Sequence, residues 1–420
     1  MKKSPLNEIK LLLFCAIIGA VSGILFWVFL FLVRNGTRLL WDLIPNRLLP
    51  YPWYPVLACT LGGLIIGLLH KKYGNYPEDM MTVFGTLKKT GTYPYRKIVV
   101  LAVSALLPLI FGASVGPEAG MVGIVVALCC WAGENMKFAG NLSREYSEIG
   151  AAVSLSVLFH SPLFGILDVE EGEERNTENK ASISGTTKIL LYCVATGAGF
   201  GCIYLLNLVT GQKASGFPSF SNISPQTADY ALFLLYLLCG ILFGVFFEIA
   251  EKLFTRIASR IPVVAGEIIA GMILGTIACF IPAVRFSGEE ALGELIEGFA
   301  LYAPLAMIGL AFLKVLMTNL CIKLGLKGGH FFPLIFGAAL LGYGISLLLF
   351  PGDGSHASFA AAVVTAGTLG VTLKKPLAVS MLMLLCFPIK SLLWIVPAAA
   401  SASFASKTLT RKLNKEETAE

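Results

Sequence analysis

One acidic residue in an apolar, glycine-rich setting is the strongest candidate for chemistry in this sequence. Glu118 lies in the stretch GASVGPEAG, 112–120, between the apolar runs IVVLAVSALLPLIF and MVGIVVALCCW. Acidic residues inside membrane segments are rare and are functional by default. A carboxylate there can carry a proton, or it can occupy the place of a diffusible anion. The structural alternative is a glutamate that only accepts hydrogen bonds from nearby amides.

A second glycine-rich stretch, GLKGGHFFP at 325–333, also precedes an apolar run with helical character. Pro117 in the first stretch suits the first turn of a helix. A helix that begins inside the membrane leaves N–H groups unpaired and carries partial positive charge at that end. Two such ends that converge could hold an anion without a full positive charge, which suits rapid release. His330 would contribute its amide there, or it would simply bond to backbone.

The elements that position these stretches belong to a membrane protein. The chain has 420 residues, of which 56% are hydrophobic and 14% are charged, and its mean hydropathy is +0.77. The longer apolar runs are 11–33, 189–211, 230–247, 268–284 and 331–352. Shorter runs, broken by Gly, Pro or charge, are 54–69, 119–133, 300–313 and 376–389. We therefore expect an all-α bundle that mixes spanning helices with half-helices and re-entrant segments.

Basic residues make the net charge +6 and gather in clusters near residues 71–97 and 407–415. In a protein this apolar, such clusters indicate cytoplasmic loops and not a nucleic-acid site. The sequence thus predicts both termini in the cytoplasm, with 407–420 as a basic tail. Metal-ligand clusters, a phosphate-binding Gly-x-x-x-x-Gly-Lys motif and the motifs of intramembrane enzymes are not evident. We expect no cofactor, no metal and no enzymatic activity.

The two halves of the chain echo each other around a polar stretch at 168–188. The same separation, to within one residue, relates Glu118 to Phe331 and Pro162 to Pro376. Paired Gly/Pro-interrupted segments are the best sequence indication of a transport site at a repeat interface. The sequence predicts one membrane domain over 1–420, with repeat halves at 1–175 and 185–406.

These motifs resemble the CLC family of chloride channels and proton-coupled chloride transporters. The stretch Gly116-Pro117-Glu118-Ala119-Gly120 stands where the family has Gly–basic–Glu–Gly–Pro at its gating glutamate. Residues 329–333 match the family motif G-x-F-x-P in full, and LIFGAALLG follows as in the family. Residues 160–167 and 366–379 resemble two further family segments.

The resemblance implies an inverted-repeat bundle of tilted, partly spanning helices, in a homodimer of the cell membrane with one pore in each subunit. Transport of chloride or a similar small anion, passive or coupled to protons, is the implied function. Glu118 would be the gate. The residues implied in anion binding are Gly74, Asn75, Gly116, Ala119, Gly120, Gly329, His330, Phe331 and Phe332.

Three departures from the family pattern leave the transport mode and the preferred anion open. The first anion motif, G-S-G-I-P, falls at residues 73–77, where Gly74 or Asn75 stands in place of the central serine. The inner-gate tyrosine has no match after Pro397. The inner proton-transfer glutamate aligns to a glycine, and the flanking Glu171 and Glu173 are the candidate inner proton relay.

Other functions and other charged residues were weighed on the same sequence. A proton-coupled transporter of another solute, with Glu118 as the proton carrier, is the main alternative. The acids of SGEEALGELIEG, 287–298, have helical spacing and are expected on a solvated or vestibule-facing helix. Glu267 and Lys314 lie in or beside apolar runs, and we expect them to form a structural pair.

Overall fold

The computed structural model describes residues 5–47, 49–90, 92–135, 153, 155–159, 161, 164–165, 185–211, 218–220, 223 and 225–417. Within these ranges the chain is helical, and its one β-type contact is an isolated bridge between Gly116 and Gly329. The prediction of an all-α membrane protein is confirmed. The expected proton-relay residues Glu171 and Glu173 lie outside the described residues, as do His160 and Pro162.

Eight helical segments of the described chain are long and apolar enough to cross a membrane. They lie in α1 (Pro5–Arg38), α3 (Tyr54–Tyr73), α9 (Gly185–Thr210), α10 (Thr227–Ala258), α13 (Pro304–Leu324), α14 (Phe331–Leu349), α15 (Ala357–Leu373) and α17 (Leu392–Glu417). The shorter helices are α2 (Ile44–Arg47), α4 (Met80–Thr90), α5 (Ile98–Ile110), α6 (Glu118–Asn135), α11 (Val263–Ala278), α12 (Glu289–Gly298) and α16 (Pro376–Met383).

Two of the runs that looked too short to span are long helices. α13 continues past the predicted run 300–313 to Leu324, because Lys314 is buried in protein and does not end the helix. α3 likewise continues to Tyr73. By contrast, the predicted apolar run 268–284 is α-helical only as far as Ala278, where α11 (Val263–Ala278) ends. Residues 407–417, expected as a tail, continue α17.

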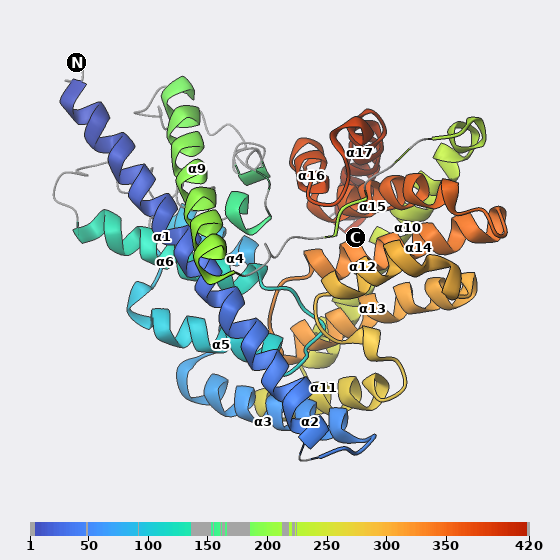
Figure 1. The fold of residues 1–420 in the computed structure, drawn as a ribbon, viewed down its shortest axis with the longest axis horizontal. Coiled ribbons are helices and arrows are strands. Elements are labelled where there is room, and N and C mark those ends of the chain that lie inside the picture. The colour runs from blue at the N-terminus through green and yellow to red at the C-terminus, as the bar shows by residue number, and fades with distance from the viewer. Residues whose placement is uncertain are drawn as a thin grey trace.

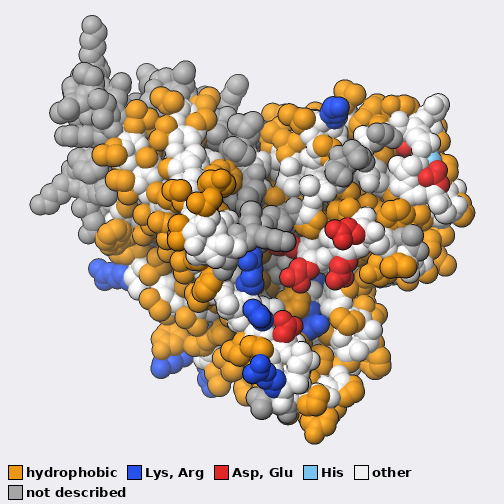
Figure 2. Space-filling model, in the orientation of Figure 1, with side chains coloured by type: hydrophobic (Ala, Val, Ile, Leu, Met, Phe, Trp, Pro, Cys, Tyr) orange, Lys and Arg blue, Asp and Glu red, His pale blue; other side chains and the backbone are white. Residues whose placement is uncertain are grey.

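The helices form two groups that meet at the glycine-rich breaks. α1, α5, α6 and α9 lie together on one side of Figure 1, and α12 to α17 lie on the other. α3 and α11 pack tightly together at the base, where a Cβ at Gly271 would meet the carbonyl oxygen of Cys59. Apolar side chains cover much of the outer surface (Figure 2), as Val209 and Leu301 do, and a surface of this kind suits lipid.

The expected pair between Glu267 and Lys314 does not form, and that prediction is wrong. Glu267 instead contacts His70 of α3. The ammonium of Lys314 is fully buried and donates to four backbone carbonyls, those of Ala283, Val284, Arg285 and Phe286, at 3.3, 3.1, 3.0 and 2.8 Å. These carbonyls lie at the end of a 3-10 turn, where acceptors lack helical partners and attract a cation.

We expect Lys314→Met to lower the stability of the protein markedly, because it leaves buried carbonyls without a donor. The loss should be about 2–4 kcal/mol on the scale of unsatisfied buried groups. Thermal unfolding in detergent, followed by intrinsic fluorescence, measures the change as a lower apparent Tm. The matched control is Lys323→Met, whose ion pair with Glu251 is partly exposed and should matter little. Equal melting temperatures for the two variants would contradict this role.

Candidate functional site

The two glycine-rich breaks are joined by a reciprocal pair of backbone hydrogen bonds. The amide of Gly116 donates to the carbonyl of Gly329 at 2.8 Å, and the amide of Gly329 donates to the carbonyl of Gly116 at 2.7 Å. α6 begins two residues after Gly116, and α14 begins two residues after Gly329. The bridge therefore brings the N-terminal ends of two half-helices to one place.

Glu118 lies at this meeting point and is 1% exposed. It is the first residue of α6, yet its Oε1 accepts a hydrogen bond from the amide of Phe332 in the first turn of α14, at 2.9 Å. Its other oxygen, Oε2, has no hydrogen-bond partner among the described residues. The carboxylate thus occupies the N-terminal end of α14, where N–H groups and partial positive charge attract an anion.

Two glycines make the room that this carboxylate needs. A Cβ placed on Gly116 or on Gly329 would collide with the carboxylate of Glu118. Neither glycine has a positive φ, so the requirement is for space and not for an unusual backbone conformation. This need for space beside the carboxylate explains the glycines that surround Glu118 in the sequence.

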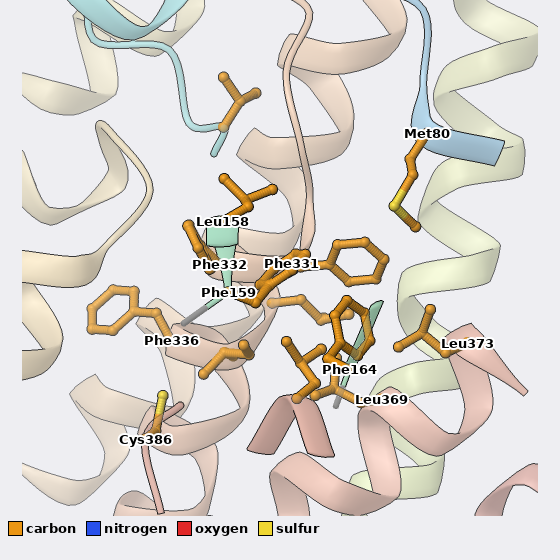
Figure 3. Packing of buried hydrophobic residues seen from close by; sticks show 14 of the residues in the cluster. Met80, Leu158, Phe159, Phe164, Phe331, Phe332, Phe336, Leu369, Leu373 and Cys386 are labelled. Atoms are coloured by element: carbon orange, nitrogen blue, oxygen red, sulfur yellow. The ribbon is translucent and has the colours of Figure 1, made fainter. Parts of the chain in front are cut away.

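Aromatic rings close one side of the site. Phe159 packs edge-on against Phe331 and Phe332, with ring centroids 5.8 and 5.4 Å apart, and against Phe164 at 4.8 Å (Figure 3). All four rings are buried. Such a dry wall lowers the local dielectric and strengthens the hydrogen bond between the amide and the carboxylate.

A cavity of about 300 Å³ also reaches Glu118. Its lining includes Ala119 and, from the second break, Gly328, Gly329, His330 and Phe331. Charged residues also line it: Asp79, Glu248, Glu251 and Lys323. The cavity therefore connects the buried carboxylate to a polar region that water and ions can occupy.

The structure brings together most of the residues that the sequence singled out. Ala119, Gly329, His330 and Phe331 line the cavity, while Phe332 donates to Glu118. Gly120 has a packing role, since a Cβ there would collide with Ala105. The expected acids of α12 include the exposed Glu290, Glu294 and Glu297, and Figure 2 shows acidic side chains gathered near this helix.

The imidazole of His330 lies among aromatic rings. Its centroid is 5.2 Å from that of Phe247 and 4.4 Å from that of Phe331. The ring thus packs as an apolar group at the edge of the cavity. This leaves the backbone at the start of α14, and not the imidazole, as the part of this motif that faces the carboxylate.

Gly74 and Asn75 lie apart from the cavity. Both are exposed, and the carbonyl of Asn75 accepts a hydrogen bond from the ammonium of Lys327 at 3.3 Å. Gly74 has a φ of +105°, a conformation that glycine adopts freely, where the chain leaves α3. The neighbouring residues that do line the cavity are Asp79 and Met80.

Asp79 is a residue that the sequence reasoning missed. Its carboxylate accepts hydrogen bonds from the amide and the hydroxyl of Thr82, at 3.0 and 2.5 Å, at the first turn of α4. Burial works against the charged form, but the Thr82 hydrogen bonds hold the pKa of Asp79 below its ordinary value. The Asp-x-x-Thr spacing before a helix is the signal that could have found this cap.

In the part of the chain that the structure describes, no group of three His, Cys, Asp or Glu side chains could hold a metal ion. The groups at the meeting point can form hydrogen bonds to an anion and can exchange a proton at Glu118. Both use groups that are already in place.

Comparison with known proteins agrees with this geometry. The voltage-gated ClC-type chloride channel ClcB of Escherichia coli O81 (strain ED1a) is 25% identical over 325 residues, which cover 73% of this chain and 72% of that protein. A crystal structure of a CLC-type fluoride/proton antiporter superimposes with a TM-score of 0.76 at 20% identity, covering 97% of this chain and 98% of the other. A slow cyanobacterial Cl⁻/H⁺ antiporter gives the same score and identity and covers 97% and 99%.

These structures share the fold of this chain, which confirms the predicted CLC-like bundle. The family profile described as "Voltage gated chloride channel" matches residues 62–407, a range that contains both breaks, Glu118 and the cavity. Since this match covers most of the sequence, the chain belongs to the voltage gated chloride channel (CLC) family.

Proposed function

We propose that this protein carries chloride or a similar small anion across the cell membrane, through the meeting point of α6 and α14, with Glu118 as the gate. The observation that carries the proposal is the hydrogen bond from the Phe332 amide to the Glu118 carboxylate. A carboxylate at a helix N-terminus occupies the place where a diffusible anion would bind. Family membership and the chloride channel name of the E. coli relative support the same reading.

Backbone amides would hold the anion once the carboxylate leaves. The first turn of α14 offers the amides of Phe331 and Phe332, and the first turn of α6 offers those of Ala119 and Gly120. Helix ends supply only partial positive charge, so an anion can be stripped of water and still leave quickly. The apolar wall of Phe159, Phe331 and Phe332 would keep competing water away.

Glu118 would leave its place when it is protonated or when an anion displaces it. A proton removes the negative charge that the amide of Phe332 stabilises, so protonation and anion entry favour the same displaced state. Protons could reach the carboxylate through the cavity that it lines. Glu171 and Glu173 remain the candidate inner relay for a proton-coupled mechanism.

The wider organisation is part of the same proposal. Helix pairs α5–α6 and α13–α14 each flank a glycine-rich break, which supports repeat halves at 1–175 and 185–406. The basic clusters support cytoplasmic termini. A homodimer with one pore in each subunit follows from the family resemblance.

We expect the purified protein in liposomes to move chloride along its gradient, with Glu118→Gln abolishing any coupled proton movement. Glutamine keeps the size of the side chain but cannot carry a proton. Chloride and pH are followed together, with the membrane potential set by potassium and valinomycin. Opposed proton movement in the wild type makes the protein an antiporter, and anion flux without protons makes it a channel.

The matched control is Glu294→Gln on the exposed face of α12, which should behave as the wild type does. The preferred anion is found by replacing chloride with fluoride, bromide or nitrate. If the wild type moves none of these anions, the proposed function is wrong and a proton-coupled transporter of another solute takes its place.

Gly329→Ala should hold the gate open. The added methyl group collides with the Glu118 carboxylate and expels it from its hydrogen bond with Phe332. Anion flux should become insensitive to Glu118, and any proton-to-anion ratio should fall about tenfold, since a hydrogen bond to a charged group contributes about 1.5–3 kcal/mol.

The control for this variant is Gly309→Ala on α13, where a Cβ would meet no atom within 4 Å. Both variants are assayed in the liposomes described above. A Gly329→Ala protein whose anion flux and proton-to-anion ratio equal those of the wild type would show that the space beside Gly329 does not keep the Glu118 carboxylate in place.

A further inference from the structure

A second buried acid lies away from Glu118, between α3 and α11. Glu267 of α11 and His70 in the last turn of α3 have fully buried side chains, and Oε1 of Glu267 is hydrogen-bonded to Nδ1 of His70. Acids in membrane segments are rare and tend to serve a function. The transport proposal above uses neither residue.

Hydrogen bonding within this pair is incomplete. Oε2 of Glu267 and Nε2 of His70 have no partner among the described residues. A buried charge with an open lone pair is costly, whereas a proton added at Oε2 of Glu267 removes that charge. Two groups in such close contact bind protons as one coupled site.

The pair adjoins the 74–77 segment and the residues that lead to the second break. The carbonyl oxygen of His70 accepts a hydrogen bond from the amide of Gly74 at 3.0 Å, at the start of the 74–77 segment. The carboxylate of Glu267 fills the space beside Gly325, whose φ of +111° ends α13 just before the second break. A Cβ at Gly325 or at Gly67 would collide with this carboxylate.

Lys327 belongs to the segment that joins α13 to the second break. It lies two residues before Gly329, and its ammonium donates to the carbonyl of Asn75 at 3.3 Å. The charged groups that act on Glu267 are His70 of α3 and Lys327 of the segment between α13 and α14. Lys327 is acted on most strongly by Asp79 and Glu78, then by Lys323, and least by Glu267.

We propose that His70 and Glu267 form a second proton-binding site, whose proton decides how far Lys327 is available to an anion in the path. With one proton shared between them, the two side chains carry a net charge of −1 and, together with Asp79 and Glu78, offset part of the charge of Lys327. One further proton from water binds the open Oε2 of Glu267 and brings the pair to zero. Less of the charge of Lys327 is then offset beside the second break, and it attracts an anion more strongly.

The proton site is tested first without transport, by infrared spectroscopy of the purified protein over a range of pH. We expect a carboxylic acid C=O band that titrates in the wild type and in Glu118→Gln but is lost in Glu267→Gln. His70→Gln, a second variant, should shift the midpoint of that band. A wild-type signal that Glu118→Gln removes entirely, or the absence of any titrating band outside exposed acids, would overturn the proposal.

The effect on transport rests on the proposed function and is measured as the half-saturating anion concentration at several pH values. The wild type should bind anion more tightly as the pH falls. Glu267→Gln should keep the tight value at every pH. In Lys327→Met the half-saturating anion concentration should be roughly tenfold higher at every pH, because one partly screened unit charge has been removed.

Lys390→Met is the control, since this exposed lysine lies in a turn distant in sequence from the site. A Glu267→Gln protein with the wild-type pH profile would overturn the link to Lys327. If the wild type carries no anion, the transport proposal fails on its own, and the infrared result still decides whether His70 and Glu267 bind a proton.

Discussion

The structure depends on one constraint: backbone groups at helix ends inside a membrane must find partners, because lipid offers none. The reciprocal hydrogen bonds between Gly116 and Gly329 meet this need for the two breaks, and the Glu118 carboxylate meets it for the Phe332 amide. Lys314 does the same for four carbonyls at the end of a turn. Under the proposed function, a site for a diffusible anion would arise where one of these partners, the Glu118 side chain, leaves.

Space made by glycine determines where such partners can lie. At the gate the room beside Gly116 and Gly329 is filled by a carboxylate. Between α3 and α11 the missing Cβ of Gly271 instead admits the backbone of the neighbouring helix. Glycine therefore has two roles in this protein. It makes a pocket for a charged group, and it allows close contact between helices that the membrane otherwise does little to drive together.

The two breaks that meet at Glu118 could be predicted from the sequence because their signals are local. An acid next to Pro117 and several glycines, and a second break with G-x-F-x-P, are each visible within ten residues of chain. Pairings between distant segments were not visible: the partner of Glu267 is His70 of α3, and Lys314 binds carbonyls, whose availability no sequence pattern reports. α13 was predicted too short for the same reason, since only packing shows that Lys314 is satisfied inside the protein.

The charges that line the cavity are consistent with helix ends, rather than cavity side chains, attracting the anion. Besides Glu118, three acids line it: Glu251 is paired with Lys323 at 2.7 Å, Glu248 is paired with Lys374 at 3.3 Å, and Asp79 accepts two hydrogen bonds from Thr82. The two ion-paired acids, Glu251 and Glu248, repel an approaching anion far less than free ones, because each lysine offsets most of the field at a distance. Asp79 keeps its charge, since Thr82 is neutral. The attraction that remains comes from the N-terminal ends of α6 and α14. Under the proposed mechanism, selectivity for anions at the meeting point would rest mainly on backbone dipoles, which no side-chain substitution along the cavity removes directly.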